Sequence, residues 1–128
     1  MVRDSRTRKT PDSASEVVES GQSGSAVTLL NLIAEQSFSI QDYVIKYSEA
    51  ATVNGIKVEF HDADSSTTAG NTTEDDALFV EELDPTDRVS HDGPVLKDVE
   101  DDIIVIVDRD GTGVDGDMIV RVGGYHLT

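Results

Sequence analysis

DDIIVIVDRDGTGVDGDMIVRVGGYHLT, residues 101–128, is the stretch that decides the fold class. Five consecutive β-branched apolar residues, Ile103 to Val107, lead into an acidic, glycine-rich connector, and the run Met118 to Val122 follows it. β-Branched side chains favour strands, and two such runs separated by a glycine-containing connector predict a β-hairpin. The connector, Asp108 to Asp117, is longer than a two-residue turn and contains four carboxylates and three glycines.

A second strand-forming run lies upstream and is rich in aromatic and β-branched residues. Its apolar residues Phe38 and Ile40 are even-numbered, whereas Tyr43 and Ile45 are odd-numbered. Side chains alternate across a strand, so one extra residue near Gln41-Asp42 would place both pairs on one face. We therefore predict one long strand with a β-bulge at that point.

Residues 53–60 predict a half-buried strand. Ile56, Val58 and Phe60 alternate there with Lys57 and Glu59. Strict alternation of apolar and polar residues is typical of a strand with one face on the core. We expect Lys57 and Glu59 to face solvent.

Further apolar runs complete an all-β pattern. Residues 77–83 and 89–99 predict strands, the second interrupted at Gly93-Pro94, and residues 26–34 fit either a buried strand or a short helix. Seven or eight short strands with frequent turn signals predict a single β-sandwich or jelly-roll-like domain over residues 26–128. Residues 1–25, which are polar and rich in Ser, Gly and Arg, are expected to form an extended arm that orders only against a partner.

The net charge of −16 is the strongest global signal. Such a surface repels nucleic acid and destabilises a compact domain through self-repulsion. The screening length falls to about 3 Å near 1 M salt, where that repulsion almost disappears. The acidity, together with only four lysines, is therefore typical of a protein that works in molar salt, and we expect a halophilic source.

Composition and sequence motifs exclude several classes of protein. The chain contains no cysteine, so disulfides and thiolate metal sites are absent. No apolar run is long enough to span a bilayer, and the N-terminus lacks the apolar region of a secretory signal. There is no phosphate-binding loop, HExxH motif, nucleophile elbow or dinucleotide fingerprint. We expect a protein that is not an enzyme and that neither binds nucleic acid nor inserts into a membrane.

The N-terminal segment is basic in contrast to the rest of the chain. Arg3, Arg6, Arg8 and Lys9 give residues 1–10 a net charge of +3, which leaves −19 on the remaining 118 residues. A protein with four cations beside so acidic a body binds nucleic acid poorly. The four cations do complement the acidic surface of a neighbouring copy. These four residues are the candidate partner-docking residues. Because molar salt screens the attraction, backbone pairing and packing must supply most of the affinity.

The connector between the two C-terminal runs invites comparison with a calcium-binding loop. Asp108, Asp110, Asp115 and Asp117 are the candidate ligands, because closely spaced carboxylates are typical of such loops. The twelfth position is Ile119 instead of a bidentate acid, so the EF-hand pattern fails. We prefer a solvated loop in which Gly supplies positive φ and Asp caps its own turn. A calcium site of another kind is the alternative, and no other cofactor is expected.

Other candidate residues are scattered. His61, His91 and His126 have no metal-ligand spacing, which favours exposed or hydrogen-bonded histidines over a metal site. Residues 61–76 form a long polar stretch that predicts a functional or mobile loop. Within it, Asn71-Thr72-Thr73 matches the N-glycosylation sequon and makes Asn71 a glycosylation candidate.

The order of features from residue 37 to 128 resembles small β-sandwich structural proteins of tailed viruses. The aromatic-rich strand precedes an amphipathic strand with an Asp loop (Ile56 to Asp64), and Asp110-Gly111-Thr112 leads to a final strand that ends in Gly-Gly-Tyr-His-Leu. Together with the acidity, the pattern resembles a capsid decoration, vertex turret or tail protein of a haloarchaeal tailed virus. It brings no catalytic residues.

The resemblance implies a role in a virion that assembles in the cytoplasm of a high-salt host. Such a protein would form a homo-oligomer, a trimer or pentamer, and dock on the major capsid protein or other virion proteins through its terminal arm. The alternative function is a carbohydrate-binding or adhesion module, calcium-dependent or not, in which Tyr43, Tyr47 and Tyr125 stack on sugars. The low aromatic content and the absence of Trp count against that alternative.

Overall fold

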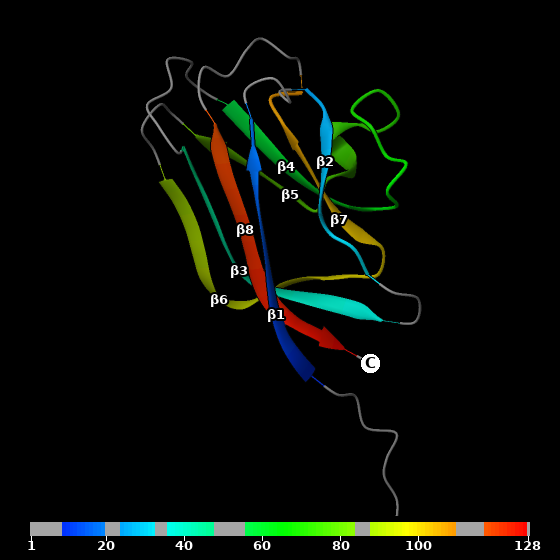
Figure 1. The fold of residues 1–128 in the computed structure, drawn as a ribbon, viewed down its shortest axis with the longest axis vertical. Coiled ribbons are helices and arrows are strands. Elements are labelled where there is room, and N and C mark those ends of the chain that lie inside the picture. The colour runs from blue at the N-terminus through cyan, green and yellow to red at the C-terminus, as the bar shows by residue number, and fades with distance from the viewer. Residues whose placement is uncertain are drawn as a thin grey trace, which may run out of the picture.

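The computed structural model describes residues 9–19, 24–32, 36–47, 56–83, 88–109 and 117–127. In these residues the chain forms eight strands and one short 3₁₀ helix, Glu74–Asp76. The strands make two four-stranded sheets that enclose one core (Figure 1). The predicted all-β sandwich is confirmed.

The two sheets draw their strands from all parts of the chain. The first sheet contains, in spatial order, β1 (Lys9–Val18), β8 (Met118–Leu127), β3 (Ser37–Tyr47) and β6 (Arg88–Val99). The second contains β2 (Ala26–Leu30), β7 (Asp102–Val107), β4 (Ile56–Ala63) and β5 (Phe79–Leu83). Every strand pairing within these sheets is antiparallel.

The pairings follow a simple rule. β1 pairs with β8, β2 with β7, β3 with β6 and β4 with β5, as in one long antiparallel ribbon folded back at β4–β5. Successive pairs alternate between the two sheets, which is the arrangement of a jelly roll. β1 and β8 form the open end of this ribbon, so β1 is an edge strand bonded to β8 alone.

The core lies between the sheets and contains alternate residues of the central strands. In β4 these are Ile56, Val58 and Phe60, and in β8 they are Met118, Val120 and Val122, all at most 2% exposed. Burying each such side chain stabilises the fold by roughly 1.5–3 kcal/mol. The alternation inferred from sequence therefore selects the core face correctly for these apolar residues.

The predicted bulge in the long strand is confirmed. The register of β3 shifts between Ile40 and Asp42 in its pairing with β6 and again in its pairing with β8. The shift places Phe38 and Ile40 on the same buried face as Tyr43 and Ile45. On β6 the partner residue jumps from Lys97 to Asp92, so the pairing is interrupted on either side of Gly93-Pro94, as expected.

The segment that fitted either a strand or a helix begins as a strand. Ala26–Leu30 is β2 and pairs with β7. Its five residues include two β-branched side chains, and the edge of β7 offers backbone groups that a strand can satisfy. The residues after Leu32 lie partly outside the described chain.

The predicted C-terminal hairpin is wrong. Both runs are strands, but β7 belongs to the second sheet and β8 to the first. The connector therefore crosses from one sheet to the other instead of reversing within one sheet. The inward-facing residues of β7 and β8 pack on the same core. Both runs therefore bury their apolar side chains without pairing with each other.

The expected boundary between arm and domain also differs from the structure. Lys9–Val18 is not an arm that awaits a partner but a strand with a ten-residue register on β8. The edge of β8 offers unpaired backbone groups, and a strand can use them whatever its side chains are. Residues 1–8 lie outside the described chain.

Candidate functional site

β1 is held almost entirely through its backbone. Of its ten residues, Val18 alone is buried, Ala14 is partly buried, and the others are exposed. Its pairs with β8 run without a shift from Lys9–Leu127 to Val18–Met118. The strand therefore presents a polar ribbon along one side of the sandwich, continuous with the basic N-terminal segment.

Two side-chain contacts add to that ladder. The Lys9 ammonium lies 4.9 Å from the centre of the Tyr125 ring, a cation–π contact. His126 Nε2 lies 2.7 Å from Asp12 Oδ2, and the His126 ring packs edge-on against Phe38 at 5.1 Å. The hydrogen bond from His126 lowers the pKa of the Asp12 carboxyl. Both contacts join β1 to β8.

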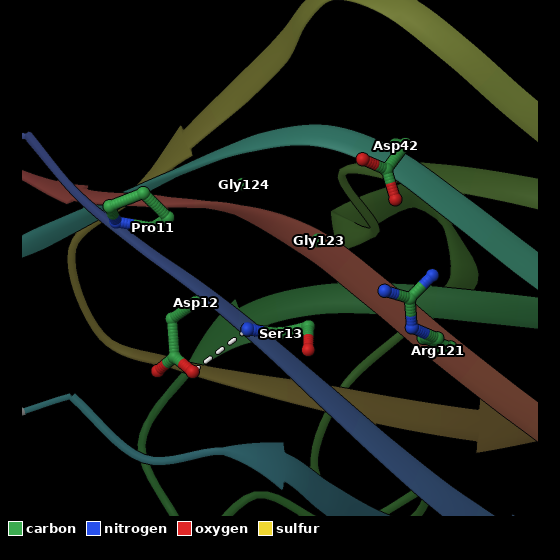
Figure 2. Close-up of a pocket in the computed structure, with 7 residues that line it drawn as sticks. All are labelled: Pro11, Asp12, Ser13, Asp42, Arg121, Gly123 and Gly124. Atoms are coloured by element: carbon green, nitrogen blue, oxygen red, sulfur yellow. Dashed lines mark hydrogen bonds between the residues drawn. The ribbon is translucent and has the colours of Figure 1, made fainter.

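An open depression of about 410 Å³ lies beside β1 on the outer face of its sheet. Its lining residues come from three strands and are Pro11, Asp12, Ser13, Asp42, Arg121, Gly123 and Gly124. Figure 2 shows the two glycines as bare backbone, with Asp42 and Arg121 on one side and the β1 residues on the other. The depression holds two carboxylates and one guanidinium.

The glycines are required by close packing. A Cβ on Gly124 would lie 1.9 Å from the Ser39 carbonyl oxygen, and one on Gly123 would lie 2.7 Å from the Asp42 carboxylate. The bulge in β3 brings this backbone close to β8, because the register shifts between Ile40 and Asp42. Side-chain-free residues at this point keep the outer face hollow next to β1.

A second polar cluster lies on β4, and the sequence prediction for Glu59 is wrong there. Glu59 was expected on the solvent side, but it is 1% exposed, and His61 two residues further along is 2% exposed. Arg109 explains the burial, because its Nε and Nη2 bind the two Glu59 oxygens at 3.0 and 2.8 Å. His61 Nε2 contacts Glu59 Oε1 at 2.8 Å. A buried carboxylate is stable where it is paired in this way.

Arg109 also fixes the long polar loop. Its Nη1 donates to the carbonyl oxygens of Ala69 and Thr72, at 2.6 and 2.8 Å. Burial raises the pKa of Glu59, but the hydrogen bonds from Arg109 and His61 outweigh it and hold the pKa below its ordinary value. The cluster ties the loop after β4 to the first turn of the connector after β7. Its geometry suits a structural role, in which Arg109 holds the loop after β4 in place.

The calcium candidates are only partly described. Asp108 is 8% exposed with φ 52°, and its amide donates to the Lys57 carbonyl at 2.8 Å. Asp117 is partly buried just before β8, and Asp110 and Asp115 lie outside the described residues. Within the described ranges, no group of three or more His, Asp or Glu side chains is placed to hold a metal ion.

The docking candidates also lie partly inside and partly outside the described residues. Lys9 is the first residue of β1 and lies over Tyr125, whereas Arg3, Arg6 and Arg8 precede the described chain. The sequence indicated these cations but not the strand that follows them, because KTPDSASEVV has few strand-favouring residues. The adjacent Gly123-Gly124 pair was the one local signal of a close backbone approach.

The remaining candidates fall in different places. Asn71 is exposed, and its side chain braces the loop by accepting from the Thr68 amide and donating to the Ser66 carbonyl. His61 and His126 are hydrogen-bonded to carboxylates, as expected, and the side chain of His91 is not described.

Of the three tyrosines proposed for sugar stacking, the structure describes the side chains of Tyr43 and Tyr125. Tyr43 is 5% exposed and stacks on Phe79 in the core. Its hydroxyl donates to Glu81, and burial together with this carboxylate raises the pKa of the phenol. Tyr125 is covered by Lys9, and the side chain of Tyr47 is not described. No described pair of tyrosines forms an open stacking platform.

Comparison with known proteins adds no family to these observations. No protein-family model matches the chain, and no curated protein is significantly similar to it. No helix in the described ranges combines the length and apolarity required to cross a bilayer.

Proposed function

We propose that this chain is a non-enzymatic structural protein of a virion, a capsid decoration or vertex turret subunit. It assembles as a homo-oligomer and docks on neighbouring subunits, including the major capsid protein, through its N-terminal segment. The viral assignment follows from the resemblance drawn from the sequence. The assembly role is supported by the geometry of β1.

One observation carries the assembly role. β1 is a ten-residue strand at the sheet edge with a single buried side chain, and it continues directly into the basic segment. Long exposed edge strands invite pairing with other chains. The basic segment adds charge complementarity to an acidic neighbour, which sets orientation more than affinity.

The site chemistry is consistent with binding instead of catalysis. The depression beside β1 combines Asp42, Arg121 and Asp12 with a glycine floor, and these are groups that form salt bridges and hydrogen bonds across an interface. The buried Glu59–His61–Arg109 cluster is saturated by its own contacts and by two loop carbonyls. Its role is to hold the loop.

Light scattering on three versions of the chain tests the assembly role. The full chain, a chain lacking residues 1–8 and a chain lacking residues 1–18 are compared in about 3 M salt, where surface repulsion is screened. The full chain should form a discrete oligomer, the first truncation should need a higher concentration to assemble, and the second should be monomeric. Circular dichroism checks that each version keeps its β structure.

The truncation of residues 1–8 guards against a trivial result. It leaves every described strand intact, so loss of affinity in this version does not reflect unfolding. A monomeric full chain at all concentrations would contradict the proposal. So would an oligomer whose mass and concentration dependence are the same in all three versions.

A further inference from the structure

We propose that β1 is exchanged between copies of this chain, so that Lys9–Val18 of one copy pairs with β8 of another. This inference rests on the proposed function and names the element and partner through which assembly occurs. It commits to a second copy as the occupant of the β8 edge. Domain swapping of an identical element is a low-cost route to an oligomer.

The side-chain anchoring of β1 favours exchange. Leaving β8 would uncover one buried side chain, Val18, and a partly buried Ala14. The backbone ladder, the Lys9–Tyr125 pair and the Asp12–His126 pair all join β1 to β8, so a β8 from a second copy recreates each of them. Exchange therefore loses little and regains the same contacts.

The topology also permits exchange. β1 is the first strand and lies at the open end of the folded ribbon, bonded to β8 on one side only. It leaves the sheet without threading past another element. In Figure 1 it runs along the outside of the sandwich.

The sequence between β1 and β2 is suited to a hinge. Glu19 to Ser25 reads ESGQSGS, a composition typical of flexible linkers. Gly24 has φ 82°, in the left-handed region, and its amide donates to the Val107 carbonyl at 2.8 Å. Seven residues reach roughly 25 Å when extended, which is enough to carry β1 away from its own β8 edge.

Charge does not oppose the exchange. Residues 1–10 carry +3 and residues 11–128 carry −19 in every copy, so the exchanged strand meets on a second copy an acidic domain of the same charge as its own.

Cross-linking through introduced cysteines tests the exchange directly, because the native chain has none. Ser15 pairs with Arg121 across β1 and β8, and both are exposed. Cα atoms of opposed antiparallel residues lie about 4.5–5.5 Å apart, within reach of a disulfide. Single variants Ser15→Cys and Arg121→Cys are mixed, unfolded and refolded together, and oxidised.

The control mixture pairs Ser15→Cys with Ser90→Cys. Ser90 is exposed on β6 at the opposite edge of the same sheet, so it reports random collision. Val17→Cys with Ile119→Cys is a second exchange pair, taken from the other end of the ladder. It covers the case in which the first pair has unfavourable disulfide geometry.

The exchange predicts a covalent mixed dimer in both test mixtures and little in the control. The double variant Ser15→Cys/Arg121→Cys should give covalently linked chains on a non-reducing gel. A double variant that yields single chains with an internal disulfide, together with no mixed dimer, overturns the exchange. Light scattering of the same sample separates the two proposals: an oligomer in that case leaves the assembly role standing, whereas a monomer removes both.

Discussion

At the scale of single residues, Glu59 shows how one buried charge organises two loops. It is 1% exposed and lies between Arg109 and His61, and the same arginine binds two carbonyls of the loop after β4. Removing one partner of a buried ion pair leaves the other charge uncompensated. The arginine is the more exposed partner, with 21% of its side chain in solvent.

Glu59→Gln is expected to lower the free energy of unfolding by about 3 kcal/mol, the lower end for a broken buried pair, because Arg109 keeps some solvent contact. Urea unfolding followed by circular dichroism measures it, and Glu82→Gln on the exposed side of β5 is the control.

The folded pKa of Glu59 lies below its ordinary value of 4.5. Its stabilisation is therefore present above that value and is lost as pH falls through the folded pKa. Glu59→Gln should lose less stability on acidification, and equal acid sensitivity would contradict the pairing.

Gly124 sets the geometry of the outer face. A Cβ there would lie 1.9 Å from a backbone oxygen of Ser39, which cannot rotate away. Gly124→Ala should therefore destabilise the domain by about 1–3 kcal/mol, as expected for overpacking. At Gly70 the nearest atom to an added Cβ is 3.7 Å away, so Gly70→Ala should have little effect. Thermal unfolding of the two variants checks this, and similar losses in both would refute the packing argument.

At the scale of elements, β1 and β8 differ sharply in how they are held. β8 is bonded on both sides and contributes Met118, Val120 and Val122 to the core. β1 is bonded on one side and buries Val18 alone. Regions with few buried apolar contacts open locally at low free-energy cost.

Backbone amides of β1 should therefore exchange with deuterium well before those of β8. Mass spectrometry of peptides from residues 9–18 and 118–127 measures the two rates in one sample. The protection of β8 should persist, since its other side pairs with β3. Equal protection of both strands would show that β1 is held by more than its ladder.

The strands with apolar faces could be predicted from the sequence, because alternation and β-branching are local. The bulge in β3 was also predictable, since the change of parity between Ile40 and Tyr43 lies within one run. The strands with which β7 and β8 pair were not predictable, because those partner strands lie far away in the sequence. β1 had no apolar pattern to reveal it, and Glu59 is buried by an arginine 50 residues away.

At the scale of the whole molecule, the feature that matters here is the large negative net charge and its effect on stability. The net charge of −16 is carried by a domain of 128 residues, and self-repulsion opposes compactness when it is not screened. Screening acts over about 10 Å at 0.1 M salt and about 3 Å at 1 M. Stability should therefore rise as salt is added.

The thermal midpoint should increase from about 0.1 M to about 2 M KCl as repulsion is screened. A variant with Glu16→Lys and Glu82→Lys, two exposed positions, carries less net charge and should gain less from salt. Differential scanning calorimetry compares the two proteins. A midpoint that is flat or falls with salt, or an equal gain in the variant, would rule out repulsion as the main cause.

The mass of the full chain by light scattering in about 3 M salt, over a range of concentrations, tests the assembly role most directly, since repulsion between copies is screened there. A single discrete oligomer that persists on dilution is the predicted result. A well-folded monomer at every concentration would contradict it and would leave β1 as an ordinary edge strand of an isolated domain.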